Sequence, residues 1–302
     1  MPNGRMAVVG SANVDLVFRA PTVPAPGQTL LGSDFTSFLG GKGANQAVAA
    51  ARLGADVSFI AKVGHDTFGS DIARTLGRNG VDVTFLSAEE GVATGTAGIV
   101  VADSGENAIV VASGANWKLE PEEIERALAA THPDLVLTQF EIREESVEAC
   151  SGQDRLVVNP APARDISDAF CAHIDILTPN RSEAEQLTGL RPSNDLTCWT
   201  CANVLFDKGI KNVVITLGSE GAFFATPHNG RRLPTLSVRA IDTTGAGDAF
   251  NGALATFLLQ GRDLENAVQL ANAVAAISTT RRGAIPSMPT LAELKEAVGR
   301  LF

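Results

Sequence analysis

Short apolar runs alternate with helical patterns along most of the chain. The apolar runs are MAVV, VSFI, LVLT, RLVVN, IDILT and NVVITL, and segments such as ANQAVAAARLG and EAEQLTG lie between them. This alternation is typical of a mostly parallel sheet whose crossover helices cover both of its faces. We therefore predict an α/β fold.

Two stretches interrupt the alternation. Residues 14–38 and 96–112 alternate apolar and polar positions around turn signals, a pattern that predicts strands and hairpins instead of crossover helices. Together they could form a small β-layer that projects from the main sheet. The chain has no internal repeat, low-complexity tract or long linker, so one domain over 1–302 is preferred to two independent domains.

A helix is predicted to begin within IDTTGAGDAFNG, residues 241–252. Apolar residues from Phe250 to Leu258 recur at helical spacing, and Gly261 supplies a stop. Asp248 is therefore expected in the first turn of this helix, among residues with very small side chains.

The start of that helix could bind an anion. A helix N-terminus presents free backbone N–H groups and a partial positive charge, and Gly245, Ala246 and Gly247 would leave those donors open. Asp248 could serve only to complement the helix dipole. A carboxylate beside a phosphate cradle is also what a phosphoryl-transfer enzyme needs to take a proton from an attacking hydroxyl.

Other polar residues follow predicted strands, where ligands of open α/β sheets bind. Asn13 and Asp15 lie two apart, so in an extended segment they point to the same side and suit the hydroxyls of a sugar. An Asx-type turn is the alternative for this pair. Glu141 comes just after an apolar strand, where a solvated loop acid is the ordinary interpretation.

The stretch FLGGKGANQAVAAARLG resembles a phosphate loop, but it matches neither common nucleotide motif. Gly40, Gly41 and Gly43 permit close backbone approach, and Lys42 adds a cation. The Walker pattern requires Ser or Thr after the lysine, and a dinucleotide fingerprint requires GxGxxG. A glycine turn that packs a helix on the sheet is the alternative, although it leaves Lys42 and Asn45 unexplained.

Two further turns carry candidate residues. Asn180 and Glu183 have the spacing of a helix capping box, and their oxygens could also hold magnesium or its waters near phosphates. Thr216, Gly218 and Ser219 follow the strand NVVITL in a compact glycine turn that a nucleotide could approach.

Composition narrows the possible partners. The chain of 302 residues has a formal net charge of -10 and no dense run of Lys and Arg, so nucleic acid and anionic membranes are poor candidates. The N-terminal stretch RMAVVGSANVDLVF becomes polar too early for a signal-peptide core, and no apolar run reaches membrane-spanning length. We therefore expect a cytoplasmic protein.

The sequence CWTC, with Cys198 and Cys201, could be a redox pair or half of a zinc site. No second CxxC is present and the four histidines are scattered, so we interpret both cysteines as ordinary, half-buried helix residues.

The order of several motifs resembles that of the ribokinase (PfkB) family of carbohydrate kinases. These motifs are GSANVD, GGKGANQAVAAARLG, NPAPA, TPNRSEAEQLTG, ITLGSEGA, DTTGAGDAFNGAL and TTRRGAIPSMP, and they cover nearly the whole chain. GGKGANQA, NPAPA and the pairing of Asn13 with Asp15 favour the members that phosphorylate ribose over fructokinase or adenosine kinase relatives.

The resemblance implies roles for individual residues. Asp248 would be the catalytic base, and the amides of Gly245, Ala246 and Gly247 would form the anion hole. The positions that match sugar contacts are Asn13, Asp15, Gly41, Lys42, Asn45 and Glu141. The positions on the ATP and Mg²⁺ side are Asn180, Glu183, Thr216, Gly218 and Ser219. A monovalent cation such as K⁺ would be held at Asp242, Thr244, Ser278, Arg281, Gly283 and Ser287, with Arg281 and Gly283 contributing backbone carbonyls.

Asn272 is a departure from the family, since ribokinases can have His at this position near adenine. The two irregular stretches match the family's β-lid, through which the resemblance implies a homodimer. The expected reaction is ATP-dependent phosphorylation of D-ribose to ribose 5-phosphate.

Three alternatives remain. The first is a kinase for fructose, deoxyribose, 2-keto-3-deoxygluconate or adenosine. The second is a non-catalytic sugar or nucleotide sensor on the same fold, which the intact GAGD disfavours. The third, a nicotinamide-dependent oxidoreductase, is weakened by the missing fingerprint.

Overall fold

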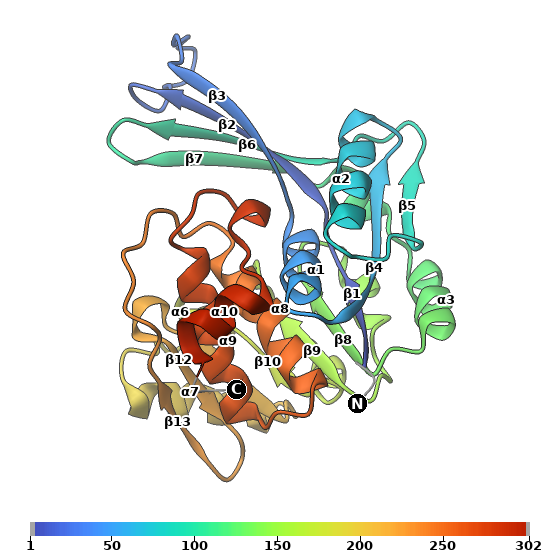
Figure 1. Cartoon of the computed structure of the whole chain (residues 1–302), viewed down its shortest axis with the longest axis vertical. Helices are drawn as coiled ribbons and strands as arrows, with labels where there is room; N and C mark the ends of the chain where they lie inside the picture. Colours follow the sequence, from blue (N-terminus) through green and yellow to red (C-terminus); the bar gives the residue numbers. More distant parts are fainter. Residues whose placement is uncertain (1–3, 300–302) are drawn as a thin grey trace.

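The computed structural model describes residues 4–299 and contains two sheets (Figure 1). The larger sheet has nine strands in the order β13-β12-β11-β10-β9-β8-β1-β4-β5. The seven strands from β11 to β5 run parallel, and β12 and β13 add an antiparallel edge. The strands are β1 (Arg5–Val9), β4 (Asp56–Gly64), β5 (Leu86–Glu89), β8 (Leu135–Gln139), β9 (Leu156–Asn159), β10 (Ile176–Leu177), β11 (Asn212–Thr216), β12 (Ala222–Ala225) and β13 (Gly230–Leu233).

Helices cover both faces of the large sheet, as the alternating pattern predicts. Successive residues of β1 enter different hydrophobic cores: Met6 and Val8 join one, and Ala7 and Val9 join the other. The first core includes α1 (Lys42–Arg52), α2 (Thr67–Arg78), α8 (Ala246–Leu259), α9 (Leu264–Ser278) and α10 (Leu291–Val298). The second includes α3 (Pro121–Thr131), α4 (Glu144–Glu148), α5 (Asp168–Cys171), α6 (Arg181–Thr188) and α7 (Asp195–Asp207).

The smaller sheet projects from the main body and contains both of the predicted irregular stretches (Figure 1). Its strand order is β3-β2-β6-β7, with β2 (Asn13–Ala20), β3 (Asp34–Gly40), β6 (Gly95–Ala102) and β7 (Asn107–Ala112). β2 pairs parallel with β6, and the two outer pairs are antiparallel. Every residue of β7 is exposed.

Close packing between α1 and α8 fixes the position of the functional residues. A Cβ atom added to Gly252 of α8 would lie 2.6 Å from the carbonyl oxygen of Gln46 and 2.7 Å from the Cβ of Ala49. Only glycine allows the two helices to approach so closely. The approach brings the first turn of α1 against the first turn of α8.

The CWTC stretch lies in α7, where Cys198 and Cys201 are both free and fully buried. They are helix residues, as expected, although they are buried more completely than the expected half-buried positions. Among residues 4–299, no group of three or more His, Cys, Asp or Glu side chains could hold a metal ion. No helix in that range is long and apolar enough to span a bilayer.

Candidate active site

Two adjoining cavities open at the carboxyl ends of the parallel strands. The smaller has a volume of about 210 Å³ and contains Lys42, Asn180, Glu183 and Asp248 in its wall. The larger, of about 410 Å³, extends along β11 and α9. The residues common to both walls are Thr216, Thr243, Ala246 and Gly247. One continuous space therefore runs past the start of α8.

The first turn of α8 supplies the residues of the predicted anion hole. Gly245 is the N-cap, with a φ of 74° in the left-handed region, where a side chain would be strained. A Cβ atom added to Gly247 would meet no other atom within 4 Å. The backbone N–H of Ala246 donates to the backbone oxygen of Thr243 at 3.2 Å. The N–H groups of Gly245 and Gly247, which have no partner among the described contacts, are therefore the donors left for a ligand in the cavity.

Asp248 is buried and held by two amide side chains. Its Oδ2 accepts a hydrogen bond from Nδ2 of Asn45 at 2.8 Å, and its Oδ1 accepts one from Nε2 of Gln46 at 3.1 Å. Burial raises the pKa of this carboxyl, while Lys42 and the two amides oppose the increase. Such an environment makes a carboxylate a better proton acceptor than an exposed one.

The residues expected on the sugar side are brought together beside Asp248. Burial raises the pKa of Asp15 to about 6, with further increases from the charges of Glu141 and Asp248 and a decrease from Lys42. The backbone N–H of Lys42 donates to Oε2 of Glu141 at 3.0 Å. Oδ1 of Asn45 is buried without a hydrogen-bond partner, so it can accept a hydrogen bond from a ligand hydroxyl.

Asn13 and Gly41, also expected on the sugar side, contact each other through their backbones. Oδ1 of Asn13 accepts a hydrogen bond from Nδ2 of Asn116 at 2.7 Å. Gly41 has a φ of 90°, and a Cβ atom there would lie 2.7 Å from the backbone nitrogen of Asn13. The glycine is required because β2 and the start of α1 touch through their backbones.

The predicted capping box is present at the start of α6. Oδ1 of Asn180 accepts from the backbone N–H groups of Ser182 and Glu183 at 2.9 and 3.0 Å. Oε2 of Glu183 accepts from the backbone N–H of Asn180 at 2.8 Å. Burial raises the pKa of the Glu183 carboxyl, against the effects of that hydrogen bond and of Lys42. Both residues also line the smaller cavity, so structure and ligand binding can share them.

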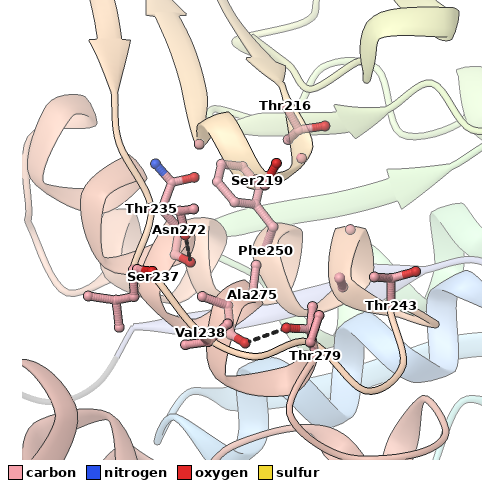
Figure 2. Close-up of a pocket in the computed structure, with 17 residues that line it drawn as sticks. Thr216, Ser219, Thr235, Ser237, Val238, Thr243, Phe250, Asn272, Ala275 and Thr279 are labelled. Carbon is pink, nitrogen blue, oxygen red and sulfur yellow. Dashed lines mark hydrogen bonds between the residues drawn. The ribbon is translucent and has the colours of Figure 1, made fainter.

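The larger cavity contains the residues expected on the nucleotide side. Figure 2 shows Thr216 and Ser219 on one side of it and Val238 and Thr279 on another. Asn272 also lines the cavity, and its Nδ2 donates to the backbone oxygen of Leu233 at 3.0 Å. Asn272 thus holds the end of β13 in place beside the cavity.

The two loops predicted to hold a monovalent cation lie against each other. Oδ2 of Asp242 accepts from the backbone N–H of Gly283 at 2.8 Å, and its Oδ1 accepts from the Thr244 hydroxyl at 2.6 Å. Burial would raise the pKa of Asp242, but these hydrogen bonds outweigh it and the pKa is lowered. The guanidinium of Arg281 pairs with Glu293, and the hydroxyls of Ser278 and Ser287 donate to carbonyl oxygens of the preceding turns.

Sequence reasoning missed several buried polar residues at this site. Four of them lie in the motifs quoted above, but no role was predicted for them, and the fifth, Gln139, lies outside those motifs. Their hydrogen bonds join residues far apart in the sequence, so no local spacing reveals them. They are Gln46, Gln139, Asn159, Thr178 and Asn251.

Comparisons with known proteins identify relatives over almost the full length. The family model described as pfkB family carbohydrate kinase matches residues 3–291. Ribokinase from Haemophilus influenzae is 42% identical over 297 residues, which cover 96% of this chain and 97% of the relative. Deoxyribokinase from Salmonella typhi is 36% identical over 298 residues, which cover 96% and 97%.

The fold also matches a solved structure. Arabidopsis thaliana ribokinase, described as complexed with ribose and ATP, superposes with a TM-score of 0.87 at 28% identity, and the match covers 97% of this chain and 98% of that one. The predicted α/β fold with a small projecting sheet is thereby confirmed.

Proposed function

Since the chain belongs to the pfkB family of carbohydrate kinases, we propose that it transfers the terminal phosphoryl group of ATP to the 5-hydroxyl of D-ribose. The observation that carries this proposal is the buried Asp248 at the start of α8, where two cavities meet. The smaller cavity has Lys42 and Asp248 in its wall, and the other sugar-side residues lie beside them. The larger cavity has room for a nucleoside.

The proposed reaction follows from this geometry. Asp248 takes the proton of the sugar hydroxyl as the hydroxyl oxygen bonds to the γ-phosphorus, and the bond from that phosphorus to the bridging oxygen of ADP breaks. The N–H groups of Gly245 and Gly247 stabilise the negative charge on the transferring group, and that of Ala246 adds to them while sharing its hydrogen bond with the backbone oxygen of Thr243. Asp15, Asn13 and Glu141 orient the sugar through its hydroxyls.

A magnesium ion fits the oxygen atoms of the smaller cavity. Glu183 carries a carboxylate with one oxygen bound to the capping N–H and the other uncommitted among the described contacts, and Asn180 adjoins it. Magnesium prefers oxygen ligands and keeps several waters. When bound, it would neutralise phosphate charge, and Glu183 and Asn180 would hold it through water.

A potassium ion fits the loops around Asp242. The Asp242, Thr244, Ser278 and Ser287 side chains and the loop carbonyls offer oxygen atoms, and the hydrogen bond from Gly283 to Asp242 fixes the two loops together. When bound there, the cation would supply positive charge beside the anion hole. Exchanging potassium for a bulky organic cation at constant ionic strength should lower kcat, and an unchanged rate would show that the loops are only structural.

The projecting sheet supports a proposed homodimer. Its outer strand β7 exposes Ile109, Val110 and Val111, and an exposed apolar strand edge of this kind is a site for pairing with another chain.

The sugar is tested by measuring ADP release with D-ribose, deoxyribose, fructose, other hexoses and nucleosides. We expect the highest kcat/KM with D-ribose. Deoxyribose is the second candidate, because a deoxyribokinase is 36% identical. A higher kcat/KM with deoxyribose than with ribose would reassign the substrate.

The base is tested with Asp248→Asn, which preserves shape. We expect kcat to fall by about 10²- to 10⁴-fold, the range for loss of a general base, with a nearly unchanged melting temperature. If Asp248 only complements the helix dipole, the Asp248→Asn protein should lose some stability and still turn over sugar at a near-normal rate. A non-catalytic sensor would instead bind ribose and ATP without turnover in the natural protein. A folded and fully active Asp248→Asn enzyme would refute the assignment.

A further inference from the structure

A line of five buried polar side chains runs beside Asp248 to the smaller cavity, whose wall contains three of them. It joins β8, α1, β9, the residue after β10, and α8. Each member is at most 6% exposed, so each needs hydrogen-bond partners from the protein or a ligand. The five are Gln139, Gln46, Asn159, Thr178 and Asn251.

Gln46 is the member that touches Asp248. Its Nε2 donates to Oδ1 of Asp248 and to Oδ1 of Asn159, both at 3.1 Å. Its Oε1 accepts a hydrogen bond from Nε2 of Gln139 at 2.7 Å. All polar atoms of the Gln46 side chain are therefore paired.

These contacts give the Gln46 amide one orientation. An ionised carboxylate only accepts hydrogen bonds, so the NH₂ group of Gln46 must face Asp248 and its oxygen must face away. That buried oxygen requires a donor, which Gln139 supplies. Gln139 consequently leaves its own Oε1 buried without a partner.

The other end of the line reaches the anion hole. Nδ2 of Asn159 donates to the backbone oxygen of Thr178 at 3.2 Å, and the Thr178 hydroxyl donates to Oδ1 of Asn251 at 2.6 Å. Nδ2 of Asn251 then donates to the backbone oxygen of Gly247 at 2.8 Å. The same line of contacts thus holds the carboxylate and the backbone beside it.

We propose that Gln46 is a positioning residue for Asp248. Gln139 fixes the orientation of the Gln46 amide, and that amide in turn holds one carboxylate oxygen of Asp248 in place and stabilises its charge. This inference rests on the proposed role of Asp248 as the base. It adds a residue that never touches either substrate and acts through Asp248 alone. The unpaired oxygen of Gln139 supports a functional origin, because a fold that needed only packing would be served by apolar side chains at both positions.

The test uses Gln46→Met, which keeps the length of the side chain and removes its polar atoms. Gln46→Glu and Gln139→Met provide independent variants in case the first does not fold. Thr256→Val is the matched control, because Thr256 is equally buried on α8 and makes one hydrogen bond, to the backbone oxygen of Gly252. The rate of ADP formation is measured in a single turnover with Mg²⁺, K⁺ and the sugar that gives the highest kcat/KM in the substrate comparison.

We expect Gln46→Met to slow phosphoryl transfer by about 10- to 100-fold, the factor for losing a hydrogen bond to a charged group. Dissociation constants for both substrates should change less than about threefold, because Gln46 contacts neither substrate and a distant substitution affects binding only slightly. Gln139→Met should act in the same direction and less strongly, and Thr256→Val should leave the rate unchanged.

The acid limb of the rate against pH should also move. A hydrogen bond from Gln46 favours the ionised form of Asp248, so its loss raises the pKa of that carboxyl and shifts the limb to higher pH. Gln46→Glu should shift it further. The charged groups that act on the same carboxyl, Lys42, Glu141, Asp15 and Glu183, are unchanged in these variants.

A double-mutant cycle with Asp248→Asn completes the test. If Gln46 acts through Asp248, adding Gln46→Met to Asp248→Asn should slow transfer no further. A full additional loss, or an unchanged rate and pH profile in folded Gln46 and Gln139 variants, would overturn the inference while leaving Asp248 as the base. Full activity of Asp248→Asn by itself would refute the proposed function instead.

Discussion

The protonation state of Asp15 should control how tightly this site binds a sugar. Burial and two neighbouring acids raise its pKa to about 6 from the ordinary value of 3.8. In the free protein, Asp15 therefore gains a proton between neutral pH and pH 5. A protonated carboxyl is a poorer acceptor for a sugar hydroxyl than the ionised form.

We expect sugar affinity to weaken below about pH 6, approaching a tenfold loss for each further pH unit if only the ionised form binds. Titration of the sugar without ATP, monitored by calorimetry, measures this directly. Asp15→Asn should bind sugar weakly and lose most of the pH dependence. A wild-type dissociation constant that stays flat between pH 5 and 7 would mean that the charge of Asp15 is not used.

The raised pKa of Asp15 should make the free protein more stable at low pH, where sugar binding is weakest. Between about pH 4 and 6, the folded state keeps the Asp15 proton that the unfolded chain releases. Folding stability from this group therefore falls as pH rises through that window. Bound sugar offsets the loss because it favours the ionised form.

At the scale of elements, an ion-pair network joins the nucleotide turn to two helices. Glu220 ends the turn Gly218–Glu220 and pairs with Arg181 of α6 and with Arg232 of β13. Arg232 also pairs with Asp195 of α7 at 2.8 Å. One carboxylate thus fixes a wall of the larger cavity against the start of α6.

Glu220→Gln should loosen that wall, because two guanidinium groups would lose their shared counter-charge. We expect KM for ATP to rise about two- to fivefold, the modest effect of partly exposed ion pairs, with an unchanged KM for sugar. Glu185→Gln is the control, since Glu185 of α6 pairs with Arg191, which follows the helix. Equal changes in both KM values would argue against a local effect on the nucleotide turn.

The sequence predicted elements well where the signal was local. The helical spacing after Asp248 and the stop at Gly261 correspond to α8, which spans Ala246–Leu259. The irregular stretches correspond to the four strands of the projecting sheet. The antiparallel pair β12 and β13 was not predicted, because its strands have only four residues each and follow a turn that was interpreted for its glycines.

The residues of the site were also predictable only where the signal was local in the sequence. Asp248 and the residues around Lys42 follow from helix starts, strand ends and family motifs. Gln46 lies in the motif GGKGANQA, but its role does not follow from the sequence. A buried residue of an Ala-rich helix is expected to pack, and its partner Asp248 is 202 positions away. Only the approach of α1 to α8 in three dimensions joins them.

At the scale of the whole molecule, the projecting sheet exposes apolar side chains on both faces. Strand register places Ile109 on the face of Asp15, and Val110 on the face of Phe18. Their exposed fractions are 55% for Ile109 and 74% for Val110. A dimer would cover one of these two faces.

Ile109→Asp and Val110→Asp test the proposed dimer separately for each face. We expect one of them to sediment as a monomer, because a charge in a buried interface is costly, and both to fold because these positions are exposed in the single chain. Leu196→Asp on α7, also exposed, is the control. Wild-type sedimentation of all three variants would exclude pairing through this sheet.

The wall shared by the two cavities has a consequence for inhibition and resistance. It is formed at α8 by Ala246 and Gly247, whose contribution to a ligand is largely backbone. A compound that links a sugar to a nucleoside through a phosphate chain would lie in the continuous space past the start of α8 and bind backbone N–H groups there, such as that of Gly247. Escape from such a compound by point mutation should be rare in selection experiments, since no substitution removes a backbone donor except proline, and a proline there would alter the same helix start that the natural substrates need.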